Sequence, residues 1–374
     1  MLRYLTAGES HGKGMVAILE GIPSGLRIIE DKIDVDLKRR RKGFGRGKRM
    51  EIETDEVEII SGTRKGFTLG SPIALFIKNR DYKIEGLPPL IFPRPGHADL
   101  AGVLKYDTKD VRNVLERASA RETSARVAVG AICKMLLSEF RIEIISHVLR
   151  IGGIEVKKRN LDFYSIRERA EKSPLRCIDK TSEEKMREEI EEAIRKGDTL
   201  GGIFEVIILG VPPGLGSFMQ YDLRLDGRIA QAIVAIPSVK AFEIGEGFLN
   251  VGFLGSEVHD EVYYDKRRGF YHKTNRAGGL EGGLSNGEPI IIRGYMKPIS
   301  TLMNPLDSVN IVTKQKAKAA VERADVCAVP AGGVIAEAVS AFEIARAMRE
   351  KFGGDSLAEM KLNYKNYIQN LRKY

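Results

Sequence analysis

The sequence predicts an α+β fold, because strand-like apolar runs and amphipathic helical segments alternate irregularly along its 374 residues. Hydrophobic residues make up 43% of the chain and charged residues 30%, a composition that supplies a large core and does not fit a disordered chain. No regular strand–helix–strand rhythm occurs, so a doubly wound sheet is not expected. No short-period repeat or low-complexity linker marks a boundary, and we therefore predict one domain over residues 1–374.

Short β-rich runs, bounded mostly by Gly or Pro, predict the strands. These runs are Val16 to Leu19, Glu51 to Ile60, Ile73 to Ile77, Ile142 to Arg150, Ile203 to Leu209 and Ile290 to Tyr295.

Two helices are predicted from charge and capping patterns. Residues 30–42 begin with acidic residues and end in a basic run before Gly43, which suits the helix dipole and the C-terminal stop. Residues 182–196 carry an apolar stripe, with Thr181 and Glu184 at the spacing of a capping box.

Two further helices are predicted from composition. Small and aliphatic residues dominate 113–138, which indicates a closely packed helix over much of that segment. Another helix covers about 336–351 and stops at Gly353. From about residue 350 the chain continues as a polar, partly helical tail.

Composition excludes several function classes. The formal charge of +9 is a moderate excess, not that of a polycation. No apolar stretch approaches the ~20 residues that cross a bilayer, and no signal-peptide layout follows Met1, so we expect a cytoplasmic protein without membrane contact. The three cysteines form no close pair and no His-Glu-x-x-His segment occurs, so neither disulfides nor a metal site is expected.

A glycine-rich run, Gly8 to Gly14, carries Ser10 and His11. It matches the G-x-S-x-G pattern of a hydrolase nucleophile elbow, in which Ser10 would attack an acyl group. An elbow needs a helix after it, whereas Met15 to Leu19 has the pattern of a strand. We favour a tight turn that presents a Ser and a His to a ligand, and keep the hydrolase as an alternative.

A basic run, Lys38 to Arg49, holds eight Lys or Arg in twelve residues. A nucleic-acid surface is the alternative here, although a single Phe offers little base stacking. The run is not a P-loop, because Arg49 stands where Ser or Thr should follow Gly47-Lys48. Arginines on a glycine-rich loop suit a small polyanion, because guanidinium groups bind carboxylate and phosphate oxygens two at a time.

Two arginine-containing motifs extend this polyanion hypothesis. In Arg94 to Asp99, a loop histidine, His97, is capable of proton transfer near neutral pH. In the 113–138 helix, Arg117 and Arg121 share one face and are costly beside small residues unless an anion meets them.

Two later motifs complete the candidate site. Glycines in 278–287 precede a strand that is followed by Lys297 to Thr301, a Lys and two hydroxyls that suit a phosphate or a heteroaromatic ring. Arg323 and Asp325 are either a surface ion pair or, in a cleft, an anion ligand and a proton acceptor.

Taken together, these segments resemble the chorismate synthase family from Leu2 to about Ala341. The resemblance is carried by ordered motifs at family spacing: Thr6 to Gly12, Arg40 to Met50, Arg94 to Asp99, Arg117 to Thr123, Val239-Lys240 with Glu243 to Gly245, Thr274-Asn275 with Ala277 to Gly279, and Lys297 to Thr301. Ala241 stands where the family pattern has a glycine, and the tail after about 350 is particular to this chain.

The resemblance implies a β-α-β sandwich and a lyase that converts 5-enolpyruvylshikimate 3-phosphate into chorismate and phosphate. This is an anti-1,4-elimination that requires reduced FMN without net oxidation, and it is the last common step of aromatic amino-acid biosynthesis. The substrate carries two carboxylates and a phosphate, which agrees with an arginine-rich site without a metal. The resemblance also implies a homotetramer and NADPH as an electron source. Since the chain has no recognisable flavin-reductase segment, a separate reductase is expected.

Carried over residue by residue, the resemblance gives three proton-transfer roles. His11 is the acid near the departing phosphate, His97 the proton source beside the flavin, and Asp325 the residue that assists proton removal. The implied substrate ligands are Ser10, Arg40, Arg46, Arg94, Arg121 and Arg323. The implied FMN or NADPH contacts are Arg40, Arg46, Arg117, Ala118, Ser119, Pro237, Ser238, Gly282, Lys297, Pro298, Ile299, Ser300, Thr301 and Arg323.

Overall fold

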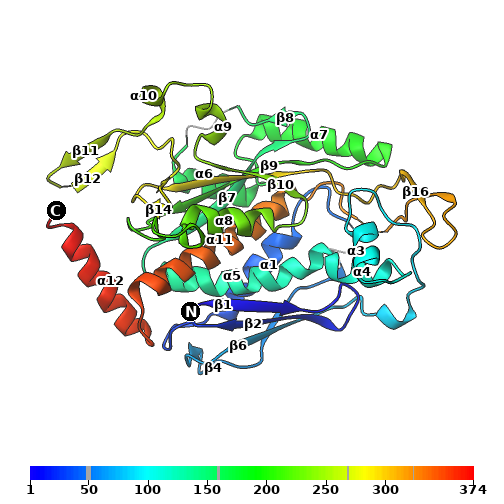
Figure 1. The fold of residues 1–374 in the computed structure, drawn as a ribbon, viewed down its shortest axis with the longest axis horizontal. Coiled ribbons are helices and arrows are strands. Elements are labelled where there is room, and N and C mark those ends of the chain that lie inside the picture. The colour runs from blue at the N-terminus through cyan, green and yellow to red at the C-terminus, as the bar shows by residue number, and fades with distance from the viewer. Residues whose placement is uncertain (48–51, 158–160, 268, 323) are drawn as a thin grey trace.

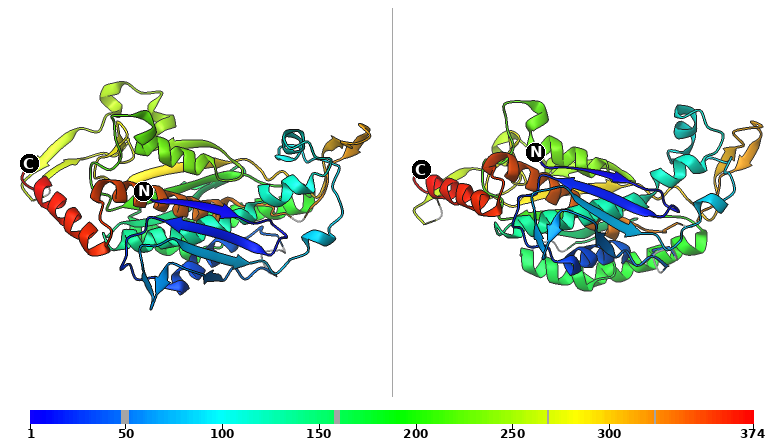
Figure 2. Two further views of the ribbon diagram at one scale, coloured as in Figure 1. Left: turned by 60° about the horizontal axis from the view of Figure 1, so that its bottom comes forward. Right: turned by 90° about the horizontal axis from the view of Figure 1, so that it is seen from below.

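Two antiparallel sheets enclose a layer of helices in the computed structural model, which describes residues 1–47, 52–157, 161–267, 269–322 and 324–374. Figure 1 shows the helices between the two sheets, and Figure 2 shows the same arrangement from two other directions. The predicted α+β class is confirmed, and the layers are those of a β-α-β sandwich.

The first sheet has the strand order β1-β2-β6-β3. Its strands are β1 (Arg3–Ala7), β2 (Gly14–Glu20), β6 (Ile73–Lys78) and β3 (Val57–Ile59). Alternate side chains of the two central strands are buried against the helices, as expected for a sheet with one face on the core. These buried residues are Met15, Ala17 and Leu19 from β2 and Ile73, Leu75 and Ile77 from β6.

The second sheet has the order β10-β15-β9-β7-β8. Its strands are β10 (Val239–Ile244), β15 (Ile290–Met296), β9 (Gly202–Leu209), β7 (Glu143–Ile151) and β8 (Ile154–Glu155). Five consecutive residues are buried in each of β7 and β9, which agrees with strands in the middle of a covered sheet.

The helical layer consists of α1 (Glu30–Arg41), α5 (Thr123–Ser138), α8 (Leu225–Val234) and α11 (Val329–Phe352). The central contact is between α5 and α11, which also meets β7 and β9. A Cβ on Gly130 of α5 would lie only 2.4 Å from the Cα of Ala338 on α11. Glycine therefore permits the close helix packing that the composition of 113–138 predicted.

The remaining helices lie at the ends and edges of this sandwich. They are α3 (Asp99–Lys105), α4 (Arg112–Ala118), α6 (Phe163–Lys172), α7 (Lys180–Lys196), α9 (Gly247–Asn250), α10 (Gly255–Val258) and α12 (Leu357–Leu371). Short pairs are formed by β4 (Thr63–Arg64) with β5 (Phe67–Thr68), β11 (Val262–Asp265) with β12 (Gly269–His272), β13 (Leu280–Glu281) with β14 (Leu284–Ser285), and β16 (Asp307–Val309) with β17 (Lys316–Lys318). Single 3₁₀ turns lie at η1 (Ile84–Gly86), η2 (Ala120–Glu122) and η3 (Tyr221–Leu223).

The predicted helix over 113–138 is wrong in one respect, because the chain breaks at Ser119. This residue has φ −65° and ψ 142°, and its hydroxyl accepts a hydrogen bond from the backbone N–H of Arg121. The break separates α4 from α5, so Arg117 and Arg121 do not share a helix face. Serine competes with helical hydrogen bonding in this way because its short side chain reaches nearby backbone groups.

Three predicted boundaries also shift. The N-cap of α7 is Asp179, which accepts from the N–H of Ser182, so the proposed Thr181 capping box does not form. Helix α11 begins at Val329, seven residues before the predicted start, with Pro at its first turn. Of the run 51–60, only Val57–Ile59 is a strand; residue 51 lies outside the described residues.

The predicted tail is a packed helix, α12. Its Leu357 and Met360 are buried, and Tyr364 makes edge-to-face contacts with Phe140 and Phe352. The polar tail is thus attached to the end of α11 by an apolar stripe.

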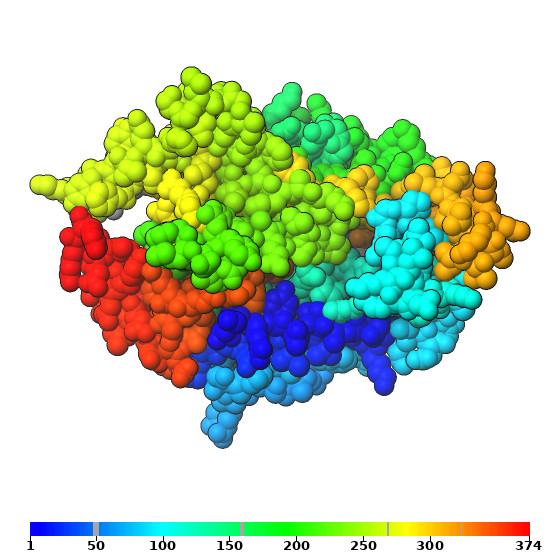
Figure 3. All heavy atoms as spheres, viewed as in Figure 1, coloured from blue at the N-terminus to red at the C-terminus, as the bar shows by residue number. Residues whose placement is uncertain are grey.

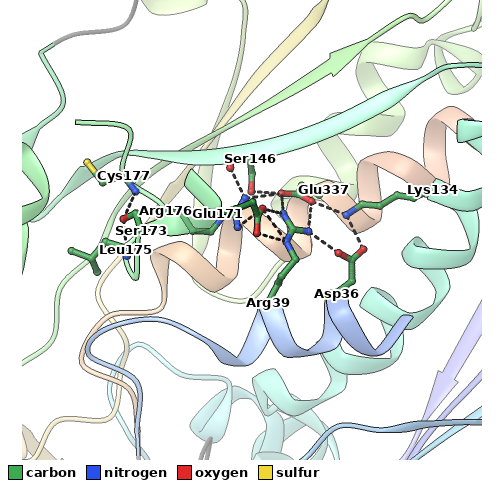
Figure 4. A network of polar contacts seen from close by, with 10 residues as sticks. All are labelled: Asp36, Arg39, Lys134, Ser146, Glu171, Ser173, Leu175, Arg176, Cys177 and Glu337. Carbon is green, nitrogen blue, oxygen red and sulfur yellow. Dashed lines mark hydrogen bonds and ion pairs between the residues drawn. The ribbon is translucent and has the colours of Figure 1, made fainter. Parts of the chain in front are cut away.

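A buried ionic network joins three helices of the central layer (Figure 4). The fully buried carboxylate of Glu337 on α11 receives hydrogen bonds from both terminal nitrogens of Arg39 at 2.8 Å and from Lys134 at 2.6 Å. Ser146 and Arg176 donate to it at 2.7 and 3.2 Å. Burial alone would raise the pKa of Glu337, but the three cations hold it well below its usual range. The charge therefore remains buried and paired.

Candidate active site

A cavity of about 640 Å³ opens where the Ser10 turn, the α4–α5 break and the edge of the second sheet meet. Figure 3 shows one face of this end of the molecule, where the cyan segment of α3 and α4 lies beside the orange β16–β17 pair. The cavity brings together sixteen of the predicted site residues from widely separated parts of the chain. They are Ser10, His11, Arg40, Arg46, Arg94, His97, Ala118, Ser119, Arg121, Pro237, Ser238, Lys297, Ile299, Ser300, Thr301 and Asp325.

Ser10 and His11 lie on the turn between β1 and β2. Asn79, directly after β6, donates from its side-chain amide to the carbonyls of Glu9, Ser10 and Gly12 at 3.0, 3.1 and 2.8 Å. One amide thus fixes the turn from inside. The hydroxyl of Ser10 donates to that of Ser119 at 3.1 Å.

The imidazole of His11 contacts a carboxylate on each side. Its Nδ1 is 2.8 Å from Oε1 of Glu116, and its Nε2 is 3.8 Å from Oδ2 of Asp81. The backbone N–H of His11 also donates to Oε2 of Glu116 at 2.7 Å. Burial would raise the pKa of Glu116, but the hydrogen bonds from His11 and the charges of His11 and Arg112 together lower it.

The guanidinium groups of Arg40 and Arg121 meet at one buried carboxylate. Asp55 accepts from Nη2 of Arg40 at 2.8 Å and, through its other oxygen, from Nη1 of Arg121. Arg121 also donates from Nε to the side chain of Asn79 at 2.8 Å. Against the effect of burial, the two cations lower the pKa of Asp55. Both guanidinium groups are therefore held in fixed directions at the cavity wall.

Arg46 and Asp325 form an ion pair of 2.7 Å within the cavity. The other oxygen of Asp325 accepts from the backbone N–H of Gly47 at 2.7 Å. The carbonyl of Gly45, a residue at φ +83°, accepts hydrogen bonds from the N–H groups of Val326 and Cys327. These bonds join the segment that carries Arg46 to the segment that carries Asp325. Burial lowers the pKa of Arg46, and Asp325 opposes that effect.

The loop after Pro93 is organised by Asp99. Arg94 donates from Nε and Nη2 to the two oxygens of Asp99 at 2.8 and 3.0 Å, and Nδ1 of His97 contacts the same carboxylate. Arg94 also donates to Thr301 at 2.8 Å. Burial would raise the pKa of Asp99, but His97 and Arg94 hold it well below its usual range. The carboxylate thus orients a guanidinium and an imidazole together.

Lys297 and Ser300 form the opposite side of this loop. Lys297 donates to the hydroxyl of Ser300 at 3.0 Å, and that hydroxyl donates to the carbonyl of Gly96 at 2.8 Å. Burial, and then the charge of Lys240, lower the pKa of Lys297. A cation in this position is well placed for an anionic ligand.

Four of the predicted site residues are not among those that line the cavity. Arg117 donates to the carbonyls of Thr6 and Gly8, Pro298 lies beside lining residues without lining the cavity itself, and Gly282 is in the β13–β14 turn. Arg323 lies outside the described residues.

Neither alternative function has structural support at its motif. The hydrolase elbow would require a helix after Ser10, whereas β1 and β2 form an antiparallel pair and the Ser10 hydroxyl faces Ser119. In the described part of the basic run, the partly buried Arg39 and the buried Arg40 are paired with carboxylates, so these arginines do not form an exposed nucleic-acid surface.

Several site residues were missed by the sequence analysis. Asp81, Lys83, Arg112 and Lys240 line the cavity, and Asn79, Asp55 and Glu116 hold lining residues from behind. Only Arg112, Glu116 and Lys240 had a local signal, because they lie in or next to motifs already singled out. Asn79, Asp81 and Lys83 come from a loop without a pattern, and Asp55 lies in the part of the 51–60 run that does not form the predicted strand.

The described residues offer neither a membrane-spanning helix nor a metal-binding cluster. No helix among them is long and apolar enough to cross a membrane. No group of three or more His, Cys, Asp or Glu side chains there is arranged to hold a metal ion.

Comparison with known proteins identifies the family of the chain. The family model for chorismate synthase matches residues 2–348. Chorismate synthases from Alkaliphilus oremlandii and Carboxydothermus hydrogenoformans are each 51% identical to the chain, with complete coverage of both sequences. A crystal structure of chorismate synthase aligns with a TM-score of 0.84 and 44% identity, over 100% of this chain and 99% of that one. The chain therefore belongs to the chorismate synthase family.

Proposed function

We propose that this enzyme eliminates phosphate from 5-enolpyruvylshikimate 3-phosphate to give chorismate, and that it requires reduced FMN. The observation that carries the proposal is the convergence of His11, His97, Arg94, Arg121 and Asp325 on one cavity, although they lie up to 314 positions apart in the chain. The family relationship supports the same reaction.

The charge of the cavity suits a substrate with two carboxylates and a phosphate. Among the described lining residues, eight are Lys or Arg and three are Asp or Glu. The guanidinium groups of Arg40, Arg94 and Arg121 are already held by buried carboxylates, so less conformational entropy is lost when they bind an anion. We assign these residues, with Ser10 and Arg46, to substrate binding.

The residues on the other side of the cavity fit a flavin. Val234, Ile236, Met296, Ile299 and Ile335 supply an apolar surface for a ring system. A volume of about 640 Å³ is within the usual range for small-molecule sites, roughly 300–1,000 Å³.

Polar groups beside this surface suit the rest of the cofactor. The ammonium of Lys297 and the hydroxyls of Ser300, Thr301, Ser119 and Ser238 are available for phosphate and ribityl oxygens. Ala118 and Pro237 line the same region. When bound, reduced FMN would supply electron density to the allylic system of the substrate and so weaken its carbon–oxygen bond to phosphate.

Three side chains carry the proton-transfer roles. His11 donates a proton to the departing phosphate, and His97 supplies a proton beside the flavin. Asp325 assists proton removal, with its direction fixed by Arg46 and the N–H of Gly47.

The remaining parts of the proposal concern partners. A separate reductase supplies reduced flavin, and NADPH is the electron source, for which Arg40 and Arg46 are the candidate contacts. The enzyme acts as a cytoplasmic homotetramer.

An anaerobic assay tests the proposal. Enzyme, reduced FMN and 5-enolpyruvylshikimate 3-phosphate are mixed, and phosphate release and chorismate absorbance are followed together. We expect equal amounts of both products and no turnover without flavin. Absence of turnover by folded protein, or equal turnover with flavin omitted, would contradict it.

A further inference from the structure

We propose that Glu116 is a positioning residue that keeps a proton on Nδ1 of His11 and turns Nε2 toward the substrate. The inference rests on the proposed function, in which His11 is the acid at the departing phosphate. Glu116 thereby determines which ring nitrogen of His11 performs the proton transfer.

The first support is the number of contacts between these residues. Glu116 accepts the backbone N–H of His11 at 2.7 Å and lies 2.8 Å from its Nδ1, and its own carbonyl accepts the N–H of Ser10 at 2.9 Å. Its side chain is only 3% exposed. One residue at the end of α4 thus fixes the main chain and the ring of His11 together.

The second support is the chemistry of the carboxylate. A carboxylate only accepts hydrogen bonds, so the nitrogen that faces it must carry the proton. The lowered pKa of Glu116 is consistent with this charged state, since the hydrogen bonds from His11, together with the charges of His11 and Arg112, outweigh the effect of burial. Nδ1 is therefore the protonated nitrogen in either the neutral or the cationic ring.

The third support is the direction of the ring. Asp81 lines the cavity, whereas Glu116 is not among the described lining residues. The distance from Nε2 to Asp81 is 3.8 Å, which is too long for a hydrogen bond. Nε2 therefore points to the cavity and is available to a ligand.

Two nearby cations, Arg112 and Lys83, are bonded to other groups and do not take over the contact of Glu116 with His11. Arg112 lies 3.8 Å from its Oε1 and is also bonded to the carbonyl of Pro88 and to Glu322. Lys83 is paired with Asp81 at 2.8 Å. Only Glu116 has a hydrogen-bond contact with the His11 ring in the described structure.

The test uses Glu116→Gln, which keeps the size of the side chain but replaces one oxygen by an N–H donor. The Gln amide N–H cannot face the backbone N–H of His11, because both groups are donors. It therefore faces Nδ1 of the ring, which must then accept, and the ring proton moves to Nε2. Histidine-labelled protein, with the His11 signals assigned by His11→Asn, would report this as an exchange of the two ring ¹⁵N shifts. The measurement needs neither substrate nor flavin.

Kinetics provide the second readout. We expect Glu116→Gln to lower kcat at least ~10-fold with little change in KM, because proton transfer and not binding is affected. In a His11→Asn background the same substitution should have no further effect, because Glu116 acts through His11. Glu122→Gln is the matched control, a buried acid in the same region that contacts Thr6 and Arg126.

Each outcome decides the proposal. Unchanged ring shifts or wild-type kcat in Glu116→Gln would overturn it, as would an equal loss in the His11→Asn background. If Glu116→Gln does not fold, Glu116→Asp keeps the charge but shortens the side chain, and wild-type kcat in that variant would overturn it. Failure of the wild-type enzyme in the anaerobic assay would instead contradict the proposed function.

Discussion

Arg46 and Asp325 lie 2.7 Å apart in the cavity, although 278 residues separate them in the chain. The acid assigned to proton removal is thus also the partner of a cation assigned to the substrate. A substitution at Asp325 should therefore affect both the chemical step and anion binding.

Replacing Asp325 should separate these two effects. We expect Asp325→Asn to lower kcat by ~100-fold or more, because the proton acceptor is lost while a polar contact to Arg46 remains. Asp325→Ala should in addition change KM, because Arg46 loses its partner. Steady-state kinetics with a flavin-binding titration would check both, and wild-type kcat in Asp325→Asn would remove its assigned role.

Replacing His97 should also lower kcat by ~100-fold or more and leave FMN binding intact. Asp99→Asn should have a larger effect on KM than His97→Ala, because Asp99 orients both His97 and Arg94. Equal KM values for the two variants would contradict this order.

Replacing Asp55 should weaken substrate binding without removing a group that contacts substrate. In Asp55→Asn, Arg40 and Arg121 lose their shared negative partner, so we expect KM to rise by about tenfold, which corresponds to ~1.4 kcal/mol. Asp34→Asn offers a control, since that acid bonds the N–H of Val57 away from the cavity. A KM unchanged from wild type would show that the arginines orient themselves.

Replacing Glu337 should destabilise the fold. Glu337→Gln removes the buried negative charge that Arg39, Lys134 and Arg176 share, and we expect a loss of about 3–5 kcal/mol in the free energy of unfolding. Because the pKa of Glu337 is lowered in the folded chain, its contribution is present above the ordinary Glu value and decreases as the pH falls below it. Urea unfolding at pH 7 and pH 4 should show a smaller difference between variant and wild type at pH 4.

Glu343 should behave in the opposite way. Burial raises its pKa to about 7, so the folded chain holds this proton more tightly than the unfolded chain. Wild-type stability is therefore reduced as the pH rises from about 4.5 toward 7, and Glu343→Gln removes that loss. We expect the variant to be more stable than wild type at pH 8, by at most ~3 kcal/mol, and equal to it at pH 4. A larger stabilisation by Glu343→Gln at pH 4 than at pH 8, relative to wild type, would contradict the predicted sign.

The sequence predicted the regular parts of the molecule for identifiable reasons. The strand runs 73–77, 203–209 and 290–295 appear within one residue of their predicted ends, because β-rich segments between Gly or Pro have few alternatives. The Ser119 break was not predictable from composition. It depends on a side chain bonding to the backbone two residues away, and its neighbours are all good helix residues.

The candidate site likewise contains residues that the sequence predicted and residues that it did not. Motif residues such as His11, Arg94 and Lys297 line the cavity. Their supporting acids were missed, because Asp55 and Asn79 lie in loops and acquire a role only when separate segments meet. Arg117, which was also predicted at the site, is not among the lining residues and donates to the carbonyls of Thr6 in β1 and Gly8 in the β1–β2 turn.

Two neighbouring arginines of α1 contact different partners, because successive side chains on a helix diverge by about 100°. Arg39 reaches the Glu337 network and Arg40 reaches Asp55 at the cavity. A rotation of α1 about its axis would withdraw Arg40 only if it also pulled Arg39 from its carboxylate. The ionic network around Glu337 therefore fixes the rotation of α1 about its axis. Inserting or deleting a single residue in α1 before Arg39 would change the direction of the Arg40 guanidinium at the cavity.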